Sequence, residues 1–321
     1  MSDVDTFAVR ACTADDVRTV IALVRADEER VSGRPSRLVE GDIRDWWQSI
    51  DLAANSWLLT SPGSGATVGV VWLELHGTEL GITVPIADAA HPEAMPAMVD
   101  LVERRATELG LERLHVAVLV PDPEAEELLA DRGYADVRRF FEMAIELAGP
   151  PSAVVLSDEF TVQVATPEEA PAFHETLSEA FQDHWEHHDQ PFEEWWRART
   201  SDPDFDISWW FTVRDGDRTV AAIRNVPARN GGVYVASLGV RRDCRGRGLA
   251  KALLLHTFAR SVEAGFSRIT LGVDASNPTG ATALYRGVGM TTELETAVWE
   301  KRLGGPVQRS GAASAAHRTA D

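Results

Sequence analysis

The feature that most constrains the fold of this chain is an internal repeat. The segment FAVRACTADDV begins at Phe7 and FTVQVATPEEA begins at Phe160, 153 positions later. In both, alternating apolar residues predict a short strand, after which Thr13 or Thr166 offers an N-cap oxygen to a helix. A second pair of segments, ELGLERLHVAV and EAGFSRITLGV, lies 155 positions apart, and each reads as a helix end followed by a strand. The chain is therefore predicted to contain two copies of one unit.

Within each copy the pattern runs strand, helices, central strands, helix, strand, helix, strand. This order predicts an α+β fold in which a mixed, mostly antiparallel sheet is flanked by helices. We expect the first copy at residues 1–147, a linker at 148–159 that contains Pro150 and Pro151, and the second copy at 160–303. Residues 304–321 are small, polar and aperiodic, which predicts a disordered tail.

The charge of the chain narrows the classes of partner. Its 321 residues include 31 Lys and Arg against 50 Asp and Glu, a formal net charge of −19. Such a field repels phosphate backbones, which argues against a nucleic-acid binder or a protein of anionic membrane surfaces. No window approaches the roughly 18 consecutive apolar residues of a membrane span, the start of the chain is acidic, and the two cysteines are too few for a disulfide framework. We therefore expect a soluble, cytoplasmic protein.

One basic stretch stands out against this acidic background. An apolar strand, Val233 to Val240, leads through a loop into a helix that starts near Leu249. Glycines let the loop backbone curl and turn its N–H groups inward, and a helix N-terminus favours an anion. Five basic residues fall in the same stretch, which predicts an anion site: Arg241, Arg242, Arg245, Arg247 and Lys251. Neither the phosphate loop of nucleotide hydrolases nor the dinucleotide-binding glycine pattern is present.

Two motifs in this half resemble the GNAT superfamily of acyl-CoA-dependent N-acyltransferases. The residues RGRGLA, 245–250, match the family signature [RQ]-x-x-G-x-[GA], and they follow a strand that ends in SLGV. The stretch VDASNPTGATALYRGVGM, 273–290, is similar to the family's downstream block of a strand, an Asn and A-x-x-L-Y-x-x-x-G. The two motifs occur in the family's order and separation. The resemblance covers about residues 160–303.

The resemblance implies a role for each matching residue, with acetyl-CoA as the acyl donor. The strand end would pair with pantetheine and polarise the thioester carbonyl, the loop would hold the pyrophosphate, and Asn277 would contact the cofactor. Tyr285 would protonate the departing CoA thiolate, although it could instead be a packed helix residue whose hydroxyl reaches water. The cofactor-binding residues implied are Leu238, Gly239, Val240, Arg245, Gly246, Arg247, Gly248, Leu249, Ala250, Lys251 and Asn277.

The implied reaction is direct attack of a primary amine of a small-molecule acceptor on acetyl-CoA, without an acyl-enzyme. A base must take a proton from the acceptor ammonium, and the strand Val233 to Val240 offers no carboxylate. Candidates for the acceptor pocket are Asp183, His184 and Glu186, in a helical region whose pattern favours a solvated polar face over a pocket. His184 and His188 have the i, i+4 spacing of a metal pair, but no third ligand has a distinctive spacing, so we expect no metal site.

The first half lacks all of these features. The region that aligns with the basic loop, Ala87 to Met98, has no glycine and no arginine, and Pro121 and Leu129 stand near the places of Asn277 and Tyr285. We expect the first half to keep the fold, to bind no acetyl-CoA, and to brace the second half. This layout is similar to that of the mycothiol synthases. Two other readings stay open: a non-catalytic acyl-CoA-binding regulator and an enzyme that acetylates proteins. The sequence gives no oligomeric state.

Overall fold

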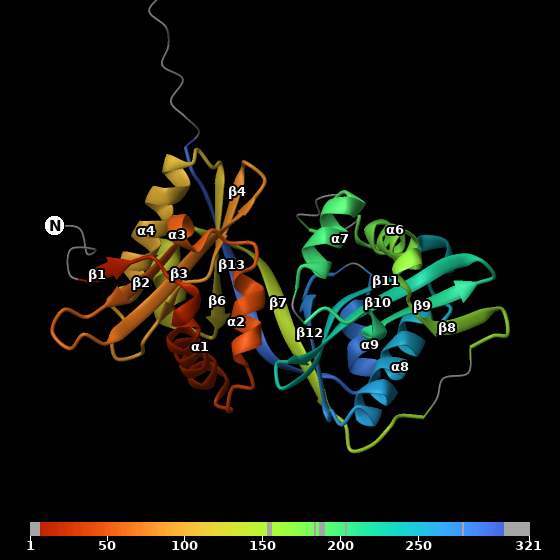
Figure 1. Ribbon diagram of the computed structural model, residues 1–321. Helices are drawn as coiled ribbons and strands as arrows, with labels where there is room; N and C mark the ends of the chain where they lie inside the picture. Colours follow the sequence, from red (N-terminus) through yellow and green to blue (C-terminus); the bar gives the residue numbers. More distant parts are fainter. Residues whose placement is uncertain are drawn as a thin grey trace, which may run out of the picture.

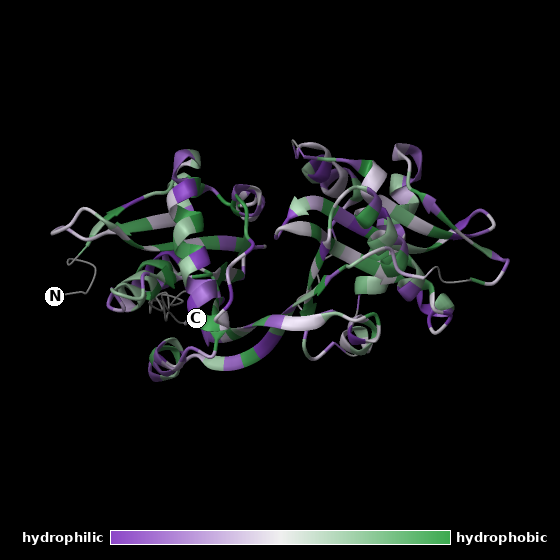
Figure 2. Cartoon of the chain, turned by 90° about the horizontal axis from the view of Figure 1, so that it is seen from below, coloured by the Kyte–Doolittle hydropathy of each residue, from purple (hydrophilic) through white to green (hydrophobic). Residues whose placement is uncertain are grey.

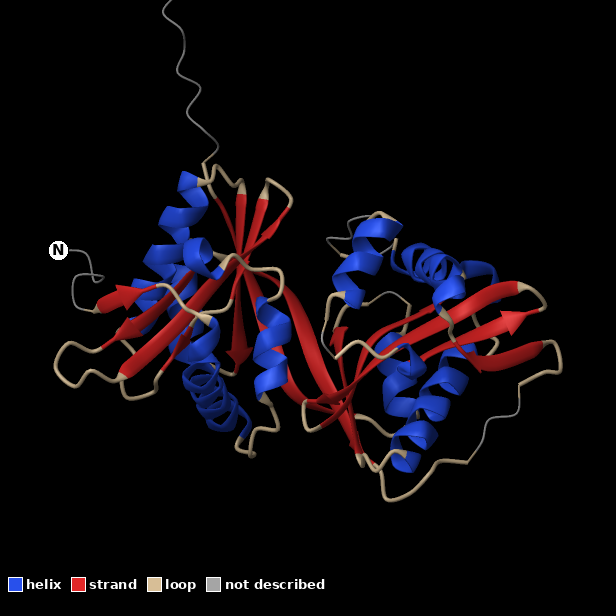
Figure 3. Ribbon diagram, in the orientation of Figure 1, coloured by secondary structure: helices blue, strands red, loops and turns tan. Residues whose placement is uncertain are grey.

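The computed structural model describes residues 7–152, 156–182, 184–185, 190–202, 204–277 and 279–304. Two lobes lie side by side and are joined by long strands that cross between them (Figure 1). Seen from below, the helices carry hydrophilic and hydrophobic residues in alternation, as helices with one buried face do (Figure 2). Helices lie on the sheet in both lobes (Figure 3). The predicted α+β architecture with two similar units is confirmed.

The first half contains the elements that the repeat predicts. Its helices are α1 (Val17–Ser32), α2 (Glu40–Trp47), α3 (Leu52–Asn55), α4 (Ala94–Glu108) and α5 (Pro123–Asp131). Its strands are β1 (Ala8–Arg10), β2 (Ser56–Thr60), β3 (Thr67–His76), β4 (Leu80–Thr83), β5 (Ile86–Ala87), β6 (Arg113–Val120) and β7 (Ala135–Glu146).

The second half repeats this order. Its helices are α6 (Ala170–Phe181), α7 (Phe192–Thr200), α8 (Leu249–Glu263) and α9 (Ala281–Gly287). Its strands are β8 (Phe160–Val164), β9 (Trp210–Asp215), β10 (Arg218–Arg229), β11 (Gly232–Val240), β12 (Arg268–Asp274) and β13 (Thr291–Arg302). The two predicted caps lie at matching places: the N–H of Thr13 donates to Asp16, and the N–H of Thr166 donates to Glu169.

The two halves exchange their last strands. In the described residues the central strand order is β6-β13-β7-β12, so β13 lies against the first half's β6 and β7 lies against the second half's β12. Residues Phe140–Glu146 of β7 pair antiparallel with β12, while Ala135–Ala144 pair with β13. Residues 295–302 of β13 pair with β6. One continuous sheet therefore runs through both lobes.

The exchange also links the hydrophobic cores. Met143 of β7 is fully buried in the core of the second half, and Ala297 of β13 is fully buried in a core of the first half. Each half therefore completes the core of the other, and the proposed sequence boundaries at 147 and 160 do not separate two independent sheets. Between them, the described residues of 148–159 form no helix or strand.

Two expectations fall partly outside the description. The predicted disordered tail, 304–321, lies beyond the described residues except for Gly304. Asp183, Glu186 and His188 are also outside them. Within the described part of the chain, no helix has the length and apolar character that crossing a bilayer requires.

Candidate active site

Strands β11 and β12 separate soon after they begin to pair. Their parallel register consists of Val233↔Ile269 and Tyr234↔Thr270. On the other side of β11 the register with β10 shifts between Arg224 and Asn225, which makes Ala236 an extra residue, a β-bulge. Beyond Tyr234, therefore, the edge of β11 that faces β12 has no strand partner among the described residues, and its backbone groups are free for a ligand.

A cavity of about 450 Å³ occupies this opening. Its walls are the end of β11, the loop before α8, the start of α8, α9 and the C-terminal end of α6. The structure brings nearly all of the candidate cofactor residues to it. Those that line it are Leu238, Gly239, Val240, Arg245, Gly246, Gly248, Leu249, Ala250, Lys251, Asn277 and Tyr285.

Glycines shape the wall of this cavity in two ways. Gly246 and Gly248 both have φ of +79° with open space around them, so a left-handed backbone rather than crowding favours glycine there. The chain turns at Gly248 into α8, whose first N–H groups have no partner within the helix. Gly239 is different, because a Cβ there would come 2.7 Å from the Cβ of Ala180. It allows α6 to approach β11 closely.

The basic residues of the loop have separate tasks. Arg241 is buried and pairs with Glu179 at 2.7 Å, and Arg245 donates to the carbonyl oxygens of Val240 and Ala180. Arg247 is not among the residues that line the cavity: it lies 3.6 Å from Glu159, with its guanidinium over the ring of Phe160. Only part of the positive charge counted in the sequence therefore faces the cavity.

Tyr285 lies on α9 and lines the cavity, and the residue is 8% exposed. Burial, and to a lesser extent Tyr234, raises the pKa of Tyr285 to about 12. The phenol therefore keeps its proton at neutral pH and can donate it to a thiolate. Asn277 lies at the rim, and its side-chain oxygen accepts a hydrogen bond from the N–H of Thr279 at 2.8 Å.

Of the three candidate acceptor residues, the structure describes His184. Its ring lies 4.3 Å from that of Phe181, and it lines the same cavity as the cofactor candidates. His184 is therefore on the cofactor side of the opening. In the described residues no group of three or more His, Cys, Asp or Glu side chains is arranged to hold a metal ion.

A second and larger cavity, the inter-half cleft, lies on the other side of the opening. It has a volume of about 1250 Å³ and shares Ala236 and Gly272 with the first cavity. Eight carboxylates from both halves line it: Asp42, Asp45, Glu74, Glu142, Glu194, Asp202, Asp204 and Asp206. The cationic residues in its lining are Arg199, Arg224 and Arg229, with His76 as a titratable neighbour.

One arginine connects the two halves across the cleft. Arg229 of β10 pairs with Asp45 of α2 at 2.5 Å and with Asp204 at 2.8 Å. These two carboxylates raise the pKa of Arg229 against the lowering effect of burial. Beside it, the N–H of Asn230 donates to Asp42. The first half is therefore a fixed wall of the cleft.

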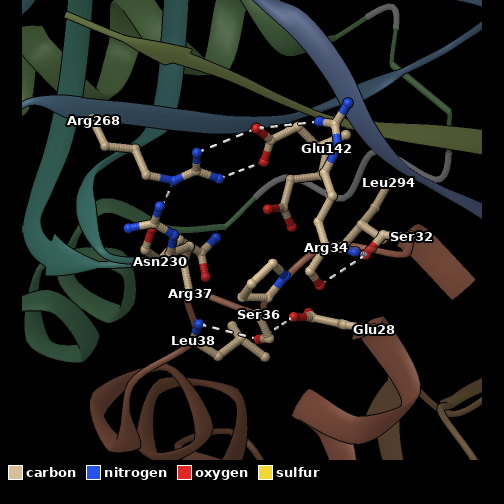
Figure 4. A pocket seen from close by; sticks show the side chains of 12 residues that line it. Glu28, Ser32, Arg34, Ser36, Arg37, Leu38, Glu142, Asn230, Arg268 and Leu294 are labelled. Carbon is tan, nitrogen blue, oxygen red and sulfur yellow. Dashed lines mark hydrogen bonds and ion pairs between the residues drawn. The ribbon is translucent and has the colours of Figure 1, made fainter. Parts of the chain in front are cut away.

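Sequence reasoning missed Glu142, which lies on β7 of the first half. Burial raises the pKa of this carboxyl to about 7, and Arg268 opposes the rise. Glu142 lines the cleft and also a small pocket near Arg268 and Glu28 (Figure 4). No local signal could have found it, because its position next to the second half follows from the strand exchange.

The corresponding part of the first half has a different lining. A cavity of about 410 Å³ lies between α1 and the segment before α4, with Asp27 and Asp88 among its residues. At the place of Tyr285 in the repeat, Leu129 is buried in the hydrophobic core. The first half therefore presents neither a glycine loop nor a phenol there.

Comparisons with known structures define the class of fold. A GCN5-related N-acetyltransferase from Sphaerobacter thermophilus aligns with a TM-score of 0.81 at 24% identity over 93% of this chain and 96% of its own. A tandem GNAT protein from the clavulanic acid biosynthesis pathway aligns with a TM-score of 0.70 at 14% identity, covering 92% of this chain and 98% of its own. The fold is thus that of tandem GNAT proteins.

Sequence comparisons find similarity to the same class of proteins. Residues 170–290 match the model of the acetyltransferase (GNAT) family. A mycothiol acetyltransferase from Geodermatophilus obscurus is 30% identical over 190 residues, which are 56% of this chain and 60% of the relative. The match thus spans about three-fifths of that curated relative. The part of the chain that matches the GNAT family therefore lies in the second half.

Proposed function

We propose that this protein is an N-acetyltransferase that transfers the acetyl group of acetyl-CoA to a primary amine of a small-molecule acceptor. The observation that carries the proposal is the cavity between the separated strands β11 and β12, which the glycine loop and Tyr285 both line. That arrangement suits a long ligand with an anionic end and a reactive end.

In this proposal the cofactor lies along the free edge of β11. Backbone groups of Leu238 to Val240 bind pantetheine, and an N–H there polarises the thioester carbonyl. The N–H groups around Gly246 and Gly248, with Lys251, hold the pyrophosphate, and Asn277 contacts the cofactor at the rim. Arg245 acts mainly by fixing the loop to α6, since its donors already contact two backbone oxygens.

The chemistry is direct attack. The neutral amine attacks the thioester carbon, the C–N bond forms, and the C–S bond breaks as the tetrahedral intermediate collapses. Tyr285 gives its proton to the leaving thiolate. Positioning and polarisation of the carbonyl account for most of the rate, so no covalent enzyme intermediate is required. The acidic cleft on the opposite side of the opening supports a cationic acceptor.

The first half, in the same proposal, does not bind acetyl-CoA but braces the second half and walls the acceptor cleft. The protein acts in the cytoplasm, in keeping with two cysteines that are both free thiols. A mycothiol-synthase-like acceptor is the second candidate, favoured by the resemblance to the mycothiol acetyltransferase of Geodermatophilus obscurus. A non-catalytic acyl-CoA-binding regulator is the alternative from another class.

The test is release of free CoA thiol on incubation with acetyl-CoA and a panel of amines. Tyr285→Phe should lower kcat at least about tenfold with little change in acetyl-CoA affinity, because a missing general acid acts on the chemical step. Tyr134→Phe is the matched control, since Tyr134 is a buried tyrosine of the first half that donates to Glu103.

Calorimetric titration with acetyl-CoA should give one site per chain. Binding without thiol release for any amine would favour the regulator. Two sites per chain would contradict the role given to the first half, and an unchanged rate for Tyr285→Phe at all pH values would remove the general-acid assignment.

A further inference from the structure

The reaction proposed above needs a group that removes a proton from the acceptor ammonium. Ala236 of β11 and Gly272 of β12 line both the cofactor cavity and the inter-half cleft, so the two cavities meet at these residues. The thioester carbonyl must lie at this junction for an amine in the cleft to reach it. The base must therefore face the cleft close to Ala236 and Gly272.

Glu142 is placed beside this junction by the strand exchange. Its Cα pairs with Gly272 across the antiparallel register of β7 and β12. Residues paired in this way project to the same face of the sheet. Gly272 has no side chain, and the Tyr234 hydroxyl lies 3.4 Å from the position of a Cβ there. Tyr234 therefore occupies the side of Gly272 that Glu142 shares, and its hydroxyl lies between Glu142 and the junction's backbone.

The other carboxylates of the cleft are already engaged. Asp45 and Asp204 pair with Arg229, and Asp42 accepts N–H groups of Val39 and Asn230. Each of the remaining four accepts at least one hydrogen bond: Glu74, Glu194, Asp202 and Asp206. Among the described residues Glu142 accepts none, so its oxygens are available to an acceptor.

We infer that Glu142, which belongs to the first half, is the general base for the acceptor amine of the second half. Its carboxylate takes one proton from the ammonium, and the neutral amine attacks the thioester carbon. The second N–H proton passes to water as the intermediate collapses, and the thiolate takes the proton of Tyr285. Tyr285 then regains a proton from water and Glu142 returns its proton to water, so that one proton is released overall. The inference rests on the proposed function.

Charged and titratable groups surround Glu142 from every element packed against it. Arg268 lowers its pKa, while Glu293 and Asp42 add to the rise that burial causes, with the result of about 7. A base acts when ionised, so kcat/KM should rise as the pH increases through this value. The groups that face it are Glu28 (α1), Asp42 (α2), Tyr234 (β11), Arg268 (β12) and Glu293 (β13).

The test is the pH profile of Glu142→Gln. We expect kcat/KM for an alkylamine to fall about 100-fold or more, within the range for lost general bases. The rise of kcat/KM with pH near 7, the limb of the profile, should disappear. Acetyl-CoA affinity should stay within threefold, which also shows that the variant is folded. With an acceptor analogue whose amine is already neutral at pH 7, the defect should shrink, because no proton has to be removed before attack.

Glu28→Gln is the matched control. Burial also raises the pKa of Glu28 to about 7. Its side chain, however, lines the small pocket and not the cleft, and its carboxylate accepts a hydrogen bond from the hydroxyl of Ser36. It should keep the rate at high pH and still show a pH-dependent rise, moved toward lower pH because the Glu28 charge no longer opposes the ionisation of Glu142. A Glu142→Gln variant that keeps both overturns the inference, as does an equal defect with the neutral amine. Absence of thiol release in the wild type with every amine instead removes the proposed function, and the base role with it.

A separate observation concerns two arginines of the cleft. Arg199 and Arg224 both line the inter-half cleft, and burial, followed by the charge of Arg224, lowers the pKa of Arg199 to about 10. The polar contacts of Arg199 are long, 3.5 Å to both Gln190 and the Trp195 carbonyl. Arg224 donates no hydrogen bond among the described residues, and burial lowers its pKa as well. Among the described residues neither arginine forms an ion pair, although Asp45 and Asp202 act electrostatically on Arg224 and the Arg199 guanidinium lies 5.1 Å from the centre of the Trp195 ring.

The geometry points to a subsite at Arg199 and Arg224 for an anionic group, carboxylate or phosphate, on the acceptor. Tyr234 interacts electrostatically with both Arg224 and Glu142, so the subsite and the base flank one side chain. The acceptor that fits is an amine that also carries an anion. This inference depends on the location of the acceptor cleft and not on the identity of the base.

Matched amines with a carboxylate, a phosphate or a neutral amide tail distinguish the possibilities. Arg224→Gln should raise KM for one or both anionic amines about tenfold to 100-fold, as lost charge-assisted hydrogen bonds do, and leave kcat and the amide-tailed amine little changed. Arg218→Gln, an exposed arginine paired with Asp243, is the control. A wild-type enzyme that prefers the amide tail, or a variant that affects all three amines equally, would overturn the subsite.

Discussion

At the scale of single residues, the shape of the cavity wall before α8 depends more on backbone conformation than on side-chain charge. The loop before α8 attracts notice in the sequence for its arginines, yet Arg241 and Arg247 are paired with Glu179 and Glu159. The loop lines the cavity with its curled backbone, and Arg245 and Lys251 line it as well. The glycines are therefore the residues whose loss should be felt most.

Gly248→Ala tests this view. An L residue in the left-handed conformation costs about 1–2 kcal/mol, and relief of that strain would move the N–H groups at the start of α8. We expect acetyl-CoA affinity to fall about tenfold, measured by calorimetry. Gly133→Ala provides the control, because Gly133 has φ of +80° and open space but lies in the first half. It should lower stability by a similar amount without changing the affinity; equal loss of affinity in both variants would contradict the prediction.

At the scale of elements, local patterns were enough to predict the parts and insufficient to predict their pairing. The strand expected at Val233–Val240 is Gly232–Val240, and the helix expected near Leu249 begins at that residue. Both depend on periodicity and turn chemistry, which short segments carry. The β6-β13-β7-β12 order depends instead on contacts between residues more than 100 positions apart, and no periodicity encodes those.

The same reason explains what was missed in the site. The candidate cofactor residues lie in one stretch of chain with a recognisable spacing, and all of them except Arg247 line one cavity. Glu142 lies between Phe141 and Met143 in a strand of the first half. The alternation of polar and apolar residues there indicates only which residues share a face of the sheet. The sequence suggested acceptor residues near His184, while the cleft that Glu142 lines is formed by α2, β7, α7 and β10.

The strand exchange predicts that a core residue of the first half controls the stability of the second. Met143→Ala removes a fully buried side chain of β7 from the second half's core, which should lower the free energy of unfolding by about 2–5 kcal/mol. Hydrogen exchange should rise first in β12 and α9. Met98→Ala, fully buried in the first half's core, is the control and should raise exchange first in α4. Exchange confined to the first half in Met143→Ala would contradict this element-scale view.

At the scale of the whole molecule, the net charge of −19 is unevenly distributed. Eight carboxylates from both halves surround the inter-half cleft, while the glycine loop and Lys251 lie on the opposite side of the opening in the sheet. The composition shows that the chain is negatively charged, and the fold shows that many of the carboxylates lie around the inter-half cleft. A cleft formed by both halves also explains why α2 and β10 are tied together through Arg229.

The crossing of β7 and β13 has a consequence for how such a molecule can change. Two separate copies of one unit that traded their last strands would be a symmetric pair, and every substitution would then occur at both sites at once. Joining the copies in a single chain removes that constraint. One half can then lack a glycine loop that the other half has. A carboxylate on the last strand of one half, such as Glu142, can lie beside the other half without a counterpart at the equivalent position. Two halves of similar fold can therefore differ in sequence and take different roles.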